Sequence, residues 1–172
     1  MTTLTDQEIM HLMEGMDQQD VMSRPLISTP IPLSVLMEEY QSGSTEVLKK
    51  LHWLQEHGWD QVWRARGDGD CFFRSFTLAY LLRILHSSDP ALAANLAFDS
   101  IQRALPAMEA AGFDPELYED FLAPLLELVR SFAPENDELP PTEWSLIQSL
   151  QDAEKSNCIV IVRCPGLSLS RH

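Results

Sequence analysis

The chain has 172 residues, 45% of them hydrophobic, and a formal net charge of −14 with a pI near 4.5. This length fits one domain, or one domain with a mobile end. The acidic balance excludes nucleic acid and anionic membranes as partners, because both require a basic face. An acidic chain suits a basic protein surface, although acidity more often confers only solubility.

Cysteine usage and the first residues indicate the compartment. Three cysteines are too few and too unevenly spaced for a disulfide framework, and no Cys/His tract has zinc-ligand spacing, so we expect no metal and no other cofactor. The start at Met1 lacks the basic and apolar regions of a signal peptide, and no stretch approaches the roughly 20 apolar residues that span a bilayer. We therefore expect a reducing compartment, the cytoplasm, with the nucleus as a second candidate.

The first third of the chain predicts an arm, a connector, two helices and a strand. Residues 1–24 are polar, acidic and Met-rich, typical of a loosely docked arm, and residues 25–32 carry three prolines that favour an extended connector. Apolar residues at helical spacing, with Ser or Thr caps and Gly ends, predict helices over 32–40 and 45–57. The aromatic stretch 59–64 alternates in part and predicts a short strand.

A tight turn then leads into the stretch with the strongest chemical character. The sequence from Arg64 to Phe76 reads Arg-Ala-Arg-Gly-Asp-Gly-Asp-Cys-Phe-Phe-Arg-Ser-Phe, and Cys71 begins an apolar helix that is expected to run to about Leu85. A thiol at a helix N-terminus lies beside unpaired N–H groups and the positive end of the helix dipole, and both favour the thiolate. Gly67 and Gly69 let the backbone turn and aim N–H groups at one spot, as an oxyanion hole requires. Cys71 is therefore the candidate nucleophile, and the alternative is a buried structural cysteine.

The remainder of the chain is predicted to be almost entirely helical. Helices are expected to start at two Asp-Pro pairs, 89–90 and 114–115, and again at Thr142, after an acidic loop over 133–141. Their spacing predicts a core made of Leu92, Leu96, Ile101, Leu105, Leu117, Phe121, Leu125, Leu128, Trp144, Leu146, Ile147 and Leu150.

The final apolar run, 157–162, fits either a strand or a buried helix. A lone strand cannot satisfy its own backbone, so the run pairs with 59–63, or is helical, or the rest of a sheet is absent. We favour the last alternative.

A thiol hydrolase also needs an imidazole base. His52 and His57 fall in the second predicted helix or at its end, where a histidine is usually solvated or caps the helix. His86 lies 15 residues beyond Cys71, which is about 22 Å along a continuous helix. That distance excludes His86 as the base for Cys71 unless the helix breaks.

The segment from Asp68 to Phe76 resembles the Asp-Gly-Asn-Cys-Phe-Tyr-Arg-Ala-Phe motif of the ovarian tumour (OTU) cysteine proteases, and of the otubains in particular. Stretches within 25–40, 112–129 and 156–161 also look like otubain sequence. The resemblance implies an α+β fold of the OTU, papain-like type, of which this chain holds mostly the helical part with much of the sheet missing. It implies a partial peptidase domain over 25–161, between the arm 1–24 and an atypical tail 162–172.

This resemblance implies a ubiquitin-directed isopeptidase. Cys71 would attack the carbonyl between the C-terminal glycine of ubiquitin and a lysine, and Asp68 matches an aspartate that the family counts among its catalytic residues. The backbone N–H groups of Gly69 and Asp70 would stabilise the oxyanion. The implied partners are ubiquitin, polyubiquitin chains of the kind that marks proteins for degradation, and ubiquitin-conjugating enzymes.

Two departures from the family motif bear on activity. Asp70 stands where the family has Asn. The change is tolerable if this position contributes mainly its backbone, but if its side chain approaches the oxyanion, a carboxylate there opposes both the oxyanion and the thiolate. The catalytic histidine of otubains lies near the C-terminus between aromatic and acidic neighbours, whereas residues 162–172 do not look like otubain sequence and His172 lacks those neighbours. We identify no catalytic histidine. Two alternatives therefore stand beside the enzyme, a catalytically dead ubiquitin-binding module and an incomplete gene model with uncovered apolar helix faces.

Overall fold

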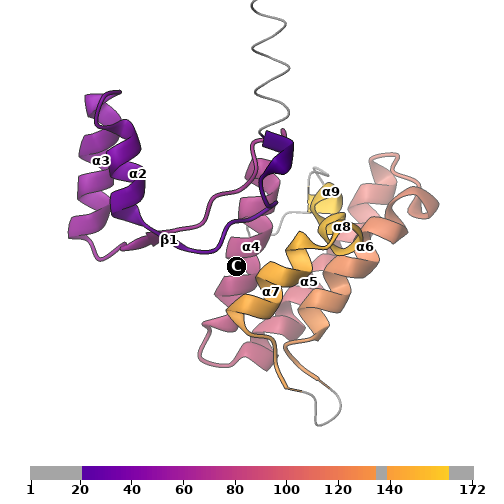
Figure 1. Ribbon diagram of the computed structural model, residues 1–172. Helices are drawn as coiled ribbons and strands as arrows, with labels where there is room; N and C mark the ends of the chain where they lie inside the picture. Colours follow the sequence, from indigo (N-terminus) through magenta and orange to yellow (C-terminus); the bar gives the residue numbers. More distant parts are fainter. Residues whose placement is uncertain (1–20, 135–138, 163–172) are drawn as a thin grey trace, which may run out of the picture. The chain divides into compact units, whose positions relative to one another are not determined.

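The structure is a computed structural model that describes residues 21–134 and 139–162. The chain divides into two compact units, Met1–Arg66 and Gly67–His172, coloured indigo to magenta and magenta to yellow in Figure 1. Residues 1–20 of the predicted arm and all but the first residue of the tail 162–172 lie outside the described residues.

The first unit is a helical hairpin joined to a two-stranded ribbon. Its elements are β1 (Ile31–Pro32), α2 (Leu33–Tyr40), α3 (Thr45–Glu56) and β2 (Gln61–Val62). The hydroxyl of Ser44 accepts a hydrogen bond from the N–H of Val47 and caps α3, and Gly58 follows that helix with φ +84°. Both predicted helices are confirmed, as is the Ser44 cap of α3, whereas α2 follows Pro32 and has no side-chain cap.

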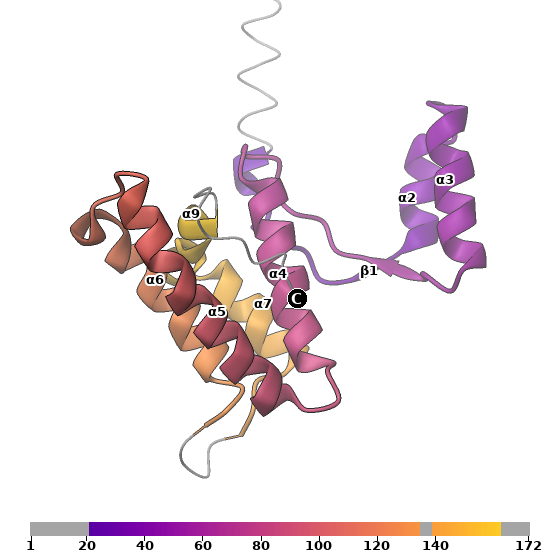
Figure 2. The same cartoon turned by 180° about the vertical axis from the view of Figure 1, so that it is seen from behind.

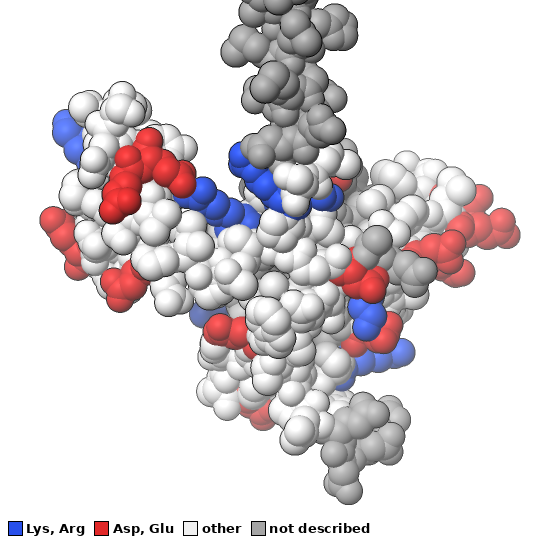
Figure 3. Space-filling model, viewed as in Figure 1, with Lys and Arg blue, Asp and Glu red and all other residues white. Residues whose placement is uncertain are grey.

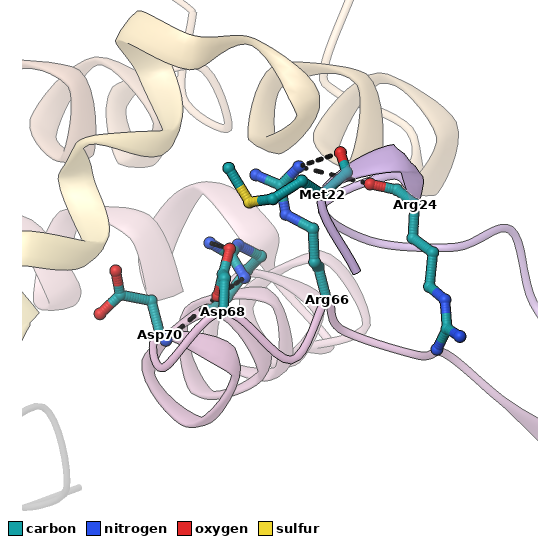
Figure 4. A network of polar contacts seen from close by, with 6 residues as sticks. Met22, Arg24, Arg66, Asp68 and Asp70 are labelled. Atoms are coloured by element: carbon teal, nitrogen blue, oxygen red, sulfur yellow. Dashed lines mark hydrogen bonds and ion pairs between the residues drawn. The ribbon is translucent and has the colours of Figure 1, made fainter. Parts of the chain in front are cut away.

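The ribbon pairs the predicted connector with the predicted aromatic strand. Ile31 lies opposite Val62 in antiparallel register, and the pairing continues through the hydrogen bond from the N–H of Ser28 to the carbonyl of Arg64, at 2.8 Å. Arg64 also forms an ion pair with Glu39 of α2, at 2.7 Å. The guanidinium of Arg66 donates to the carbonyl oxygens of Met22 and Arg24, as Figure 4 shows. Arg64 and Arg66 therefore both form contacts that stabilise the first unit.

The second unit is helical throughout its described part. Its helices are α4 (Cys71–Leu85), α5 (Pro90–Ala110), α6 (Pro115–Arg130), α7 (Glu143–Gln151), α8 (Ala153–Ser156) and α9 (Cys158–Val162). The side chains of Asp89, Asp114 and Thr142 each accept a backbone N–H at the start of a helix, so the three predicted starts are confirmed. Figures 1 and 2 show α5 beside α6, and α7 and α9 against α4.

The core of this unit lies where α4, α6, α7 and α9 meet. Leu81, Leu125 and Leu150 are inaccessible to solvent, as is Cys158. The final apolar run is thus a short buried helix and needs no neighbouring strand. The helical alternative is therefore correct for this run, and the alternative favoured from the sequence, a strand whose sheet is absent, is wrong.

Several side chains predicted to lie in the core are exposed, namely Leu92, Leu96, Leu117 and Trp144. On α5 the buried face is formed by Ala94, Ala97, Ile101 and Met108 instead. Small alanines on that face let neighbouring helices approach closely, while the leucines point away. Apolar spacing detects a stripe on a helix, but it does not decide which of two apolar stripes faces the core.

The exposed apolar faces border a groove between α4 and α5. The groove has a volume of about 500 Å³ and is lined mainly by Phe76, Ala79, Tyr80, Ile84, Leu96 and Ala97. Uncovered apolar helix faces, expected for a chain that lacks much of its sheet, are therefore present in this unit.

Charge is distributed unevenly over the surface. Figure 3 shows acidic side chains gathered at the outer end of the second unit. Burial, followed by the charge and hydrogen bond of Glu109 and the charges of Glu119 and Asp114, raises the pKa of Tyr118 above its usual value. Over 21–134 and 139–162, no helix is long and apolar enough to cross a membrane.

A matched pair of leucines on α6 tests the assignment of its faces. Leu125→Ala should lower the free energy of unfolding by about 2–5 kcal/mol, because it leaves a cavity in the core. Leu117→Ala should change it by less than about 0.5 kcal/mol, because this side chain is 73% exposed. Urea unfolding followed by circular dichroism measures both, and similar losses for the two variants would contradict the observed packing.

Candidate active site

Cys71 is the first residue of α4, and a sharp turn precedes it. Gly69 has φ +90°, which would strain any residue with a Cβ, whereas Gly67 is not in the left-handed region. Of the two glycines predicted to allow this turn, only Gly69 has a backbone conformation that requires glycine. The side chain of Cys71 is half-buried. The first N–H groups of an α-helix have no acceptor within the helix, so this thiol lies beside hydrogen-bond donors.

A two-pronged ion pair ties this turn to the helix. Nη1 of Arg74 donates to Oδ1 of Asp68 at 3.0 Å, and Nη2 donates to Oδ2 at 2.9 Å. The side chain of Arg74 is 4% exposed and that of Asp68 is 15% exposed. Figure 4 shows a dashed line between the carboxylate of Asp68 and the backbone of Asp70. Such a planar fork sets both distance and orientation.

The same carboxylate organises the turn itself. Oδ1 of Asp68 accepts the N–H of Asp70 at 3.1 Å, which closes a local turn between these two residues. To act as an oxyanion donor, the Asp70 N–H would have to exchange this carboxylate for the substrate. The assignment of Gly69 and Asp70 to an oxyanion hole, and of Asp68 to catalysis, stays a prediction.

Asp70 occupies the N-cap position of α4 but does not cap the helix with its side chain. Its backbone has φ −101° and ψ 3°, outside the extended conformation of a typical N-cap. The family motif has Asn at this position. This chain instead places a half-buried carboxylate next to the thiol.

The structural-cysteine alternative applies to Cys158. Its side chain is inaccessible to solvent, and burial raises the pKa of its thiol to about 12. A thiol in that environment stays protonated and unreactive at neutral pH. Cys71, by contrast, is accessible and lies at a helix N-terminus.

The described part of the second unit places no imidazole near Cys71. Its sole histidine, His86, caps the opposite end of α4, and its Nε2 lies 2.8 Å from Oε1 of Glu143. His57 stacks on Trp53 in the first unit at 3.9 Å between ring centroids, and His52 is exposed on α3. His172 lies outside the described residues. Among 67–134 and 139–162, the imidazole expected as a base is therefore not found beside Cys71.

Sequence reasoning missed the role of Arg74. It is an arginine within an apolar helix, three residues after the candidate nucleophile and six after Asp68. A long cation six residues after a conspicuous aspartate was the available signal.

Among the described residues, no group of three or more His, Cys, Asp or Glu side chains could hold a metal ion.

With this geometry in place, comparison with known proteins identifies the family. The family model described as Peptidase C65 Otubain matches residues 19–164. The chain belongs to the otubain family.

Curated relatives of this otubain are longer. It is 33% identical over 149 residues to OVARIAN TUMOR DOMAIN-containing deubiquitinating enzyme 1 of Arabidopsis thaliana, covering 84% of this chain and 46% of that protein. It is 26% identical over 157 residues to Ubiquitin thioesterase OTUB1 of Homo sapiens, covering 91% of this chain and 54% of that protein. The chain thus spans about half the length of these relatives.

A solved structure supports the fold assignment. A chain in the structure described as h/ceOTUB1-ubiquitin aldehyde-UBC13~Ub matches with a TM-score of 0.66 at 24% identity, over 91% of this chain and 58% of that one. The expected fold, mostly the helical part of an α+β OTU domain, is confirmed: the described residues form helices and one two-stranded sheet.

The carboxylate of Asp70 should slow the reaction of Cys71. Asp70→Asn removes a negative charge next to the thiol, and two like charges about 6 Å apart in a water-like dielectric repel each other by about 0.7 kcal/mol. Alkylation of Cys71 by iodoacetamide at pH 7, read on its peptide by mass spectrometry, should become about threefold faster. Asp70→Glu, which keeps the charge, is the control, and equal rates for all three proteins would contradict the prediction.

Burial of Cys158 makes stability depend on pH. Above pH 9 the unfolded chain releases this proton, while the folded chain keeps it until about pH 12, so rising pH favours unfolding through this window. The contribution is fully present below pH 9, and about 1.4 kcal/mol should be lost by pH 10. Urea unfolding of the wild type and of Cys158→Ala should show their difference shifting by this amount between pH 8 and pH 10. A constant difference would refute it.

Proposed function

We propose that this chain carries the nucleophile half of a ubiquitin-directed thiol isopeptidase. The observation that supports it most is the position of Cys71, accessible at the N-terminus of α4 behind a turn held by Asp68 and Arg74. The names of its otubain relatives, a deubiquitinating enzyme and a ubiquitin thioesterase, supply the substrate class.

In the proposed reaction the Cys71 thiolate attacks the carbonyl of the bond between the C-terminal glycine of ubiquitin and a lysine. N–H groups at the start of α4 stabilise the oxyanion, the lysine amine leaves with a proton, and water resolves the acyl-enzyme. Asp68 contributes by shaping the turn. Protonation of the leaving amine requires an imidazole as the general acid.

The proposed partners are ubiquitin, polyubiquitin chains of the degradation-signalling kind, and ubiquitin-conjugating enzymes, in the cytoplasm and in the nucleus. A related OTUB1 chain, in the structure described with ubiquitin aldehyde and UBC13~Ub, supports the first and third of these partners.

The second candidate function is a ubiquitin-binding module without turnover. It is favoured by one observation, that His86, the sole histidine in the described part of the second unit, caps the end of α4 opposite to Cys71. A triad that lacks a member loses most of its rate and keeps only what binding and the oxyanion hole provide.

A ubiquitin molecule with a C-terminal electrophile tests the proposal. The wild-type chain should form a covalent adduct at Cys71, and Cys71→Ser should abolish it, because the reaction needs an accessible thiol and not a base. Cys158→Ala is the matched control and should still be labelled, since Cys158 is buried. Mass spectrometry locates the adduct, and labelling that persists in Cys71→Ser would refute the assignment.

Cleavage of di-ubiquitin by the same proteins separates the two candidate functions. Cleavage that depends on Cys71 supports the isopeptidase, whereas an adduct without cleavage supports the binding module. Neither adduct nor binding would contradict both.

A further inference from the structure

We infer that Arg74 is a positioning residue for the reaction of Cys71, acting through Asp68 and Asp70. The inference deepens the proposed function and rests on it for its meaning in catalysis. The geometry that carries it lies entirely within the second unit, in residues 68–74.

Arg74 is held in one orientation by its surroundings. It is 3% exposed, one of few polar residues among the buried side chains of α4. A buried guanidinium is costly unless a carboxylate meets it in good geometry, and here both oxygens of Asp68 do so. Because separating the two charges is costly, the ion pair holds the turn at the N-terminus of α4.

Arg74 also controls the residue before the nucleophile from two sides. Its backbone N–H donates to the carbonyl of Asp70 at 2.9 Å, as the first helical hydrogen bond over Cys71. Its guanidinium holds the carboxylate that accepts the Asp70 N–H. Both peptide groups that flank Asp70 are therefore held by Arg74, one directly and one through Asp68.

This arrangement matters because the turn contains two glycines. Gly67 and Gly69 have the widest choice of backbone conformations, and a Cβ at either position would meet no atom within 4 Å. Without the fork, we expect the turn to sample more conformations. The thiol and the N–H donors beside it would then meet the scissile carbonyl in the right geometry less often.

Two substitutions of Arg74 test the inference in the full chain. Arg74→Lys keeps the charge but offers a point contact in place of the fork, and Arg74→Gln keeps a donor without the charge. Arg83→Lys and Arg83→Gln are the matched controls, because Arg83 is an exposed arginine on the same helix. The first readout is amide hydrogen exchange at Asp70, compared with Leu81 in the core of α4. The second is the rate of labelling by the ubiquitin electrophile, compared with iodoacetamide.

We expect the Asp70 amide to exchange about tenfold faster in both Arg74 variants, with Leu81 unchanged, since a hydrogen bond to a charged group is lost locally. Labelling by the ubiquitin electrophile should slow about tenfold, and alkylation by iodoacetamide should change much less, because a small reagent needs no aligned carbonyl. The Arg83 variants should match the wild type in all three measurements.

These measurements distinguish failure of the proposed function from failure of the positioning role of Arg74. If the wild type is not labelled by the ubiquitin electrophile, the proposed function fails, while the exchange at Asp70 still decides whether Arg74 holds the turn. An unchanged Asp70 amide, or acceleration shared equally by Leu81, overturns the positioning role. So does equal slowing of both reagents, which indicates damage to the helix as a whole.

Discussion

The ion pair between Asp68 and Arg74 is the constraint on which the candidate site depends. Two opposite charges, 15% and 4% exposed, meet in a fork with contacts of 2.9 and 3.0 Å. A buried pair of this kind adds little net stability compared with apolar residues, but it is costly to break and so selects one geometry. The selected geometry places a glycine turn directly before Cys71. Helix electrostatics alone would favour a thiolate there, yet would leave the turn free to move.

Helix α4 packs against the core of the second unit on one side and lines the groove beside α5 on another. Arg74, Thr77, Leu78, Leu81 and Ile84 face the helical core of the second unit. Phe76, Ala79 and Tyr80 line the groove beside α5 instead. The helix that carries the nucleophile is therefore apolar nearly all round, which is typical of a helix that is buried on both sides in a complete domain. In the described residues, the helical core covers one of those sides, and the groove lies along the other.

Local chemistry explains which features were predictable from sequence. Helix starts at Asp89, Asp114 and Thr142 depend on a side chain and an N–H two or three residues away, so sequence alone indicates them. The choice between the Leu96 and Ala97 faces of α5 depends on neighbouring helices distant in sequence. Cys71 and its glycines were evident from their spacing. The partner of Arg74 was not, because a long flexible side chain has many rotamers and only burial selects one. The short strand near Trp63 was predictable, but its pairing with residue 31 was not, since register is a tertiary property.

The nucleophile and the base of an otubain can be positioned by different parts of the chain. The described second unit holds its thiol, its turn and its helix N-terminus through contacts between residues at most six positions apart. Burial of Arg74 then selects the rotamer that meets Asp68. A base must instead be brought to the thiol from a distant segment and oriented by a third group. In the proposed reaction, capture of an electrophile needs only the first set of contacts, whereas departure of a lysine amine needs both. Capture of an electrophile is therefore physically separable from turnover in that proposal, and the Asp68–Arg74 pair belongs to the first set.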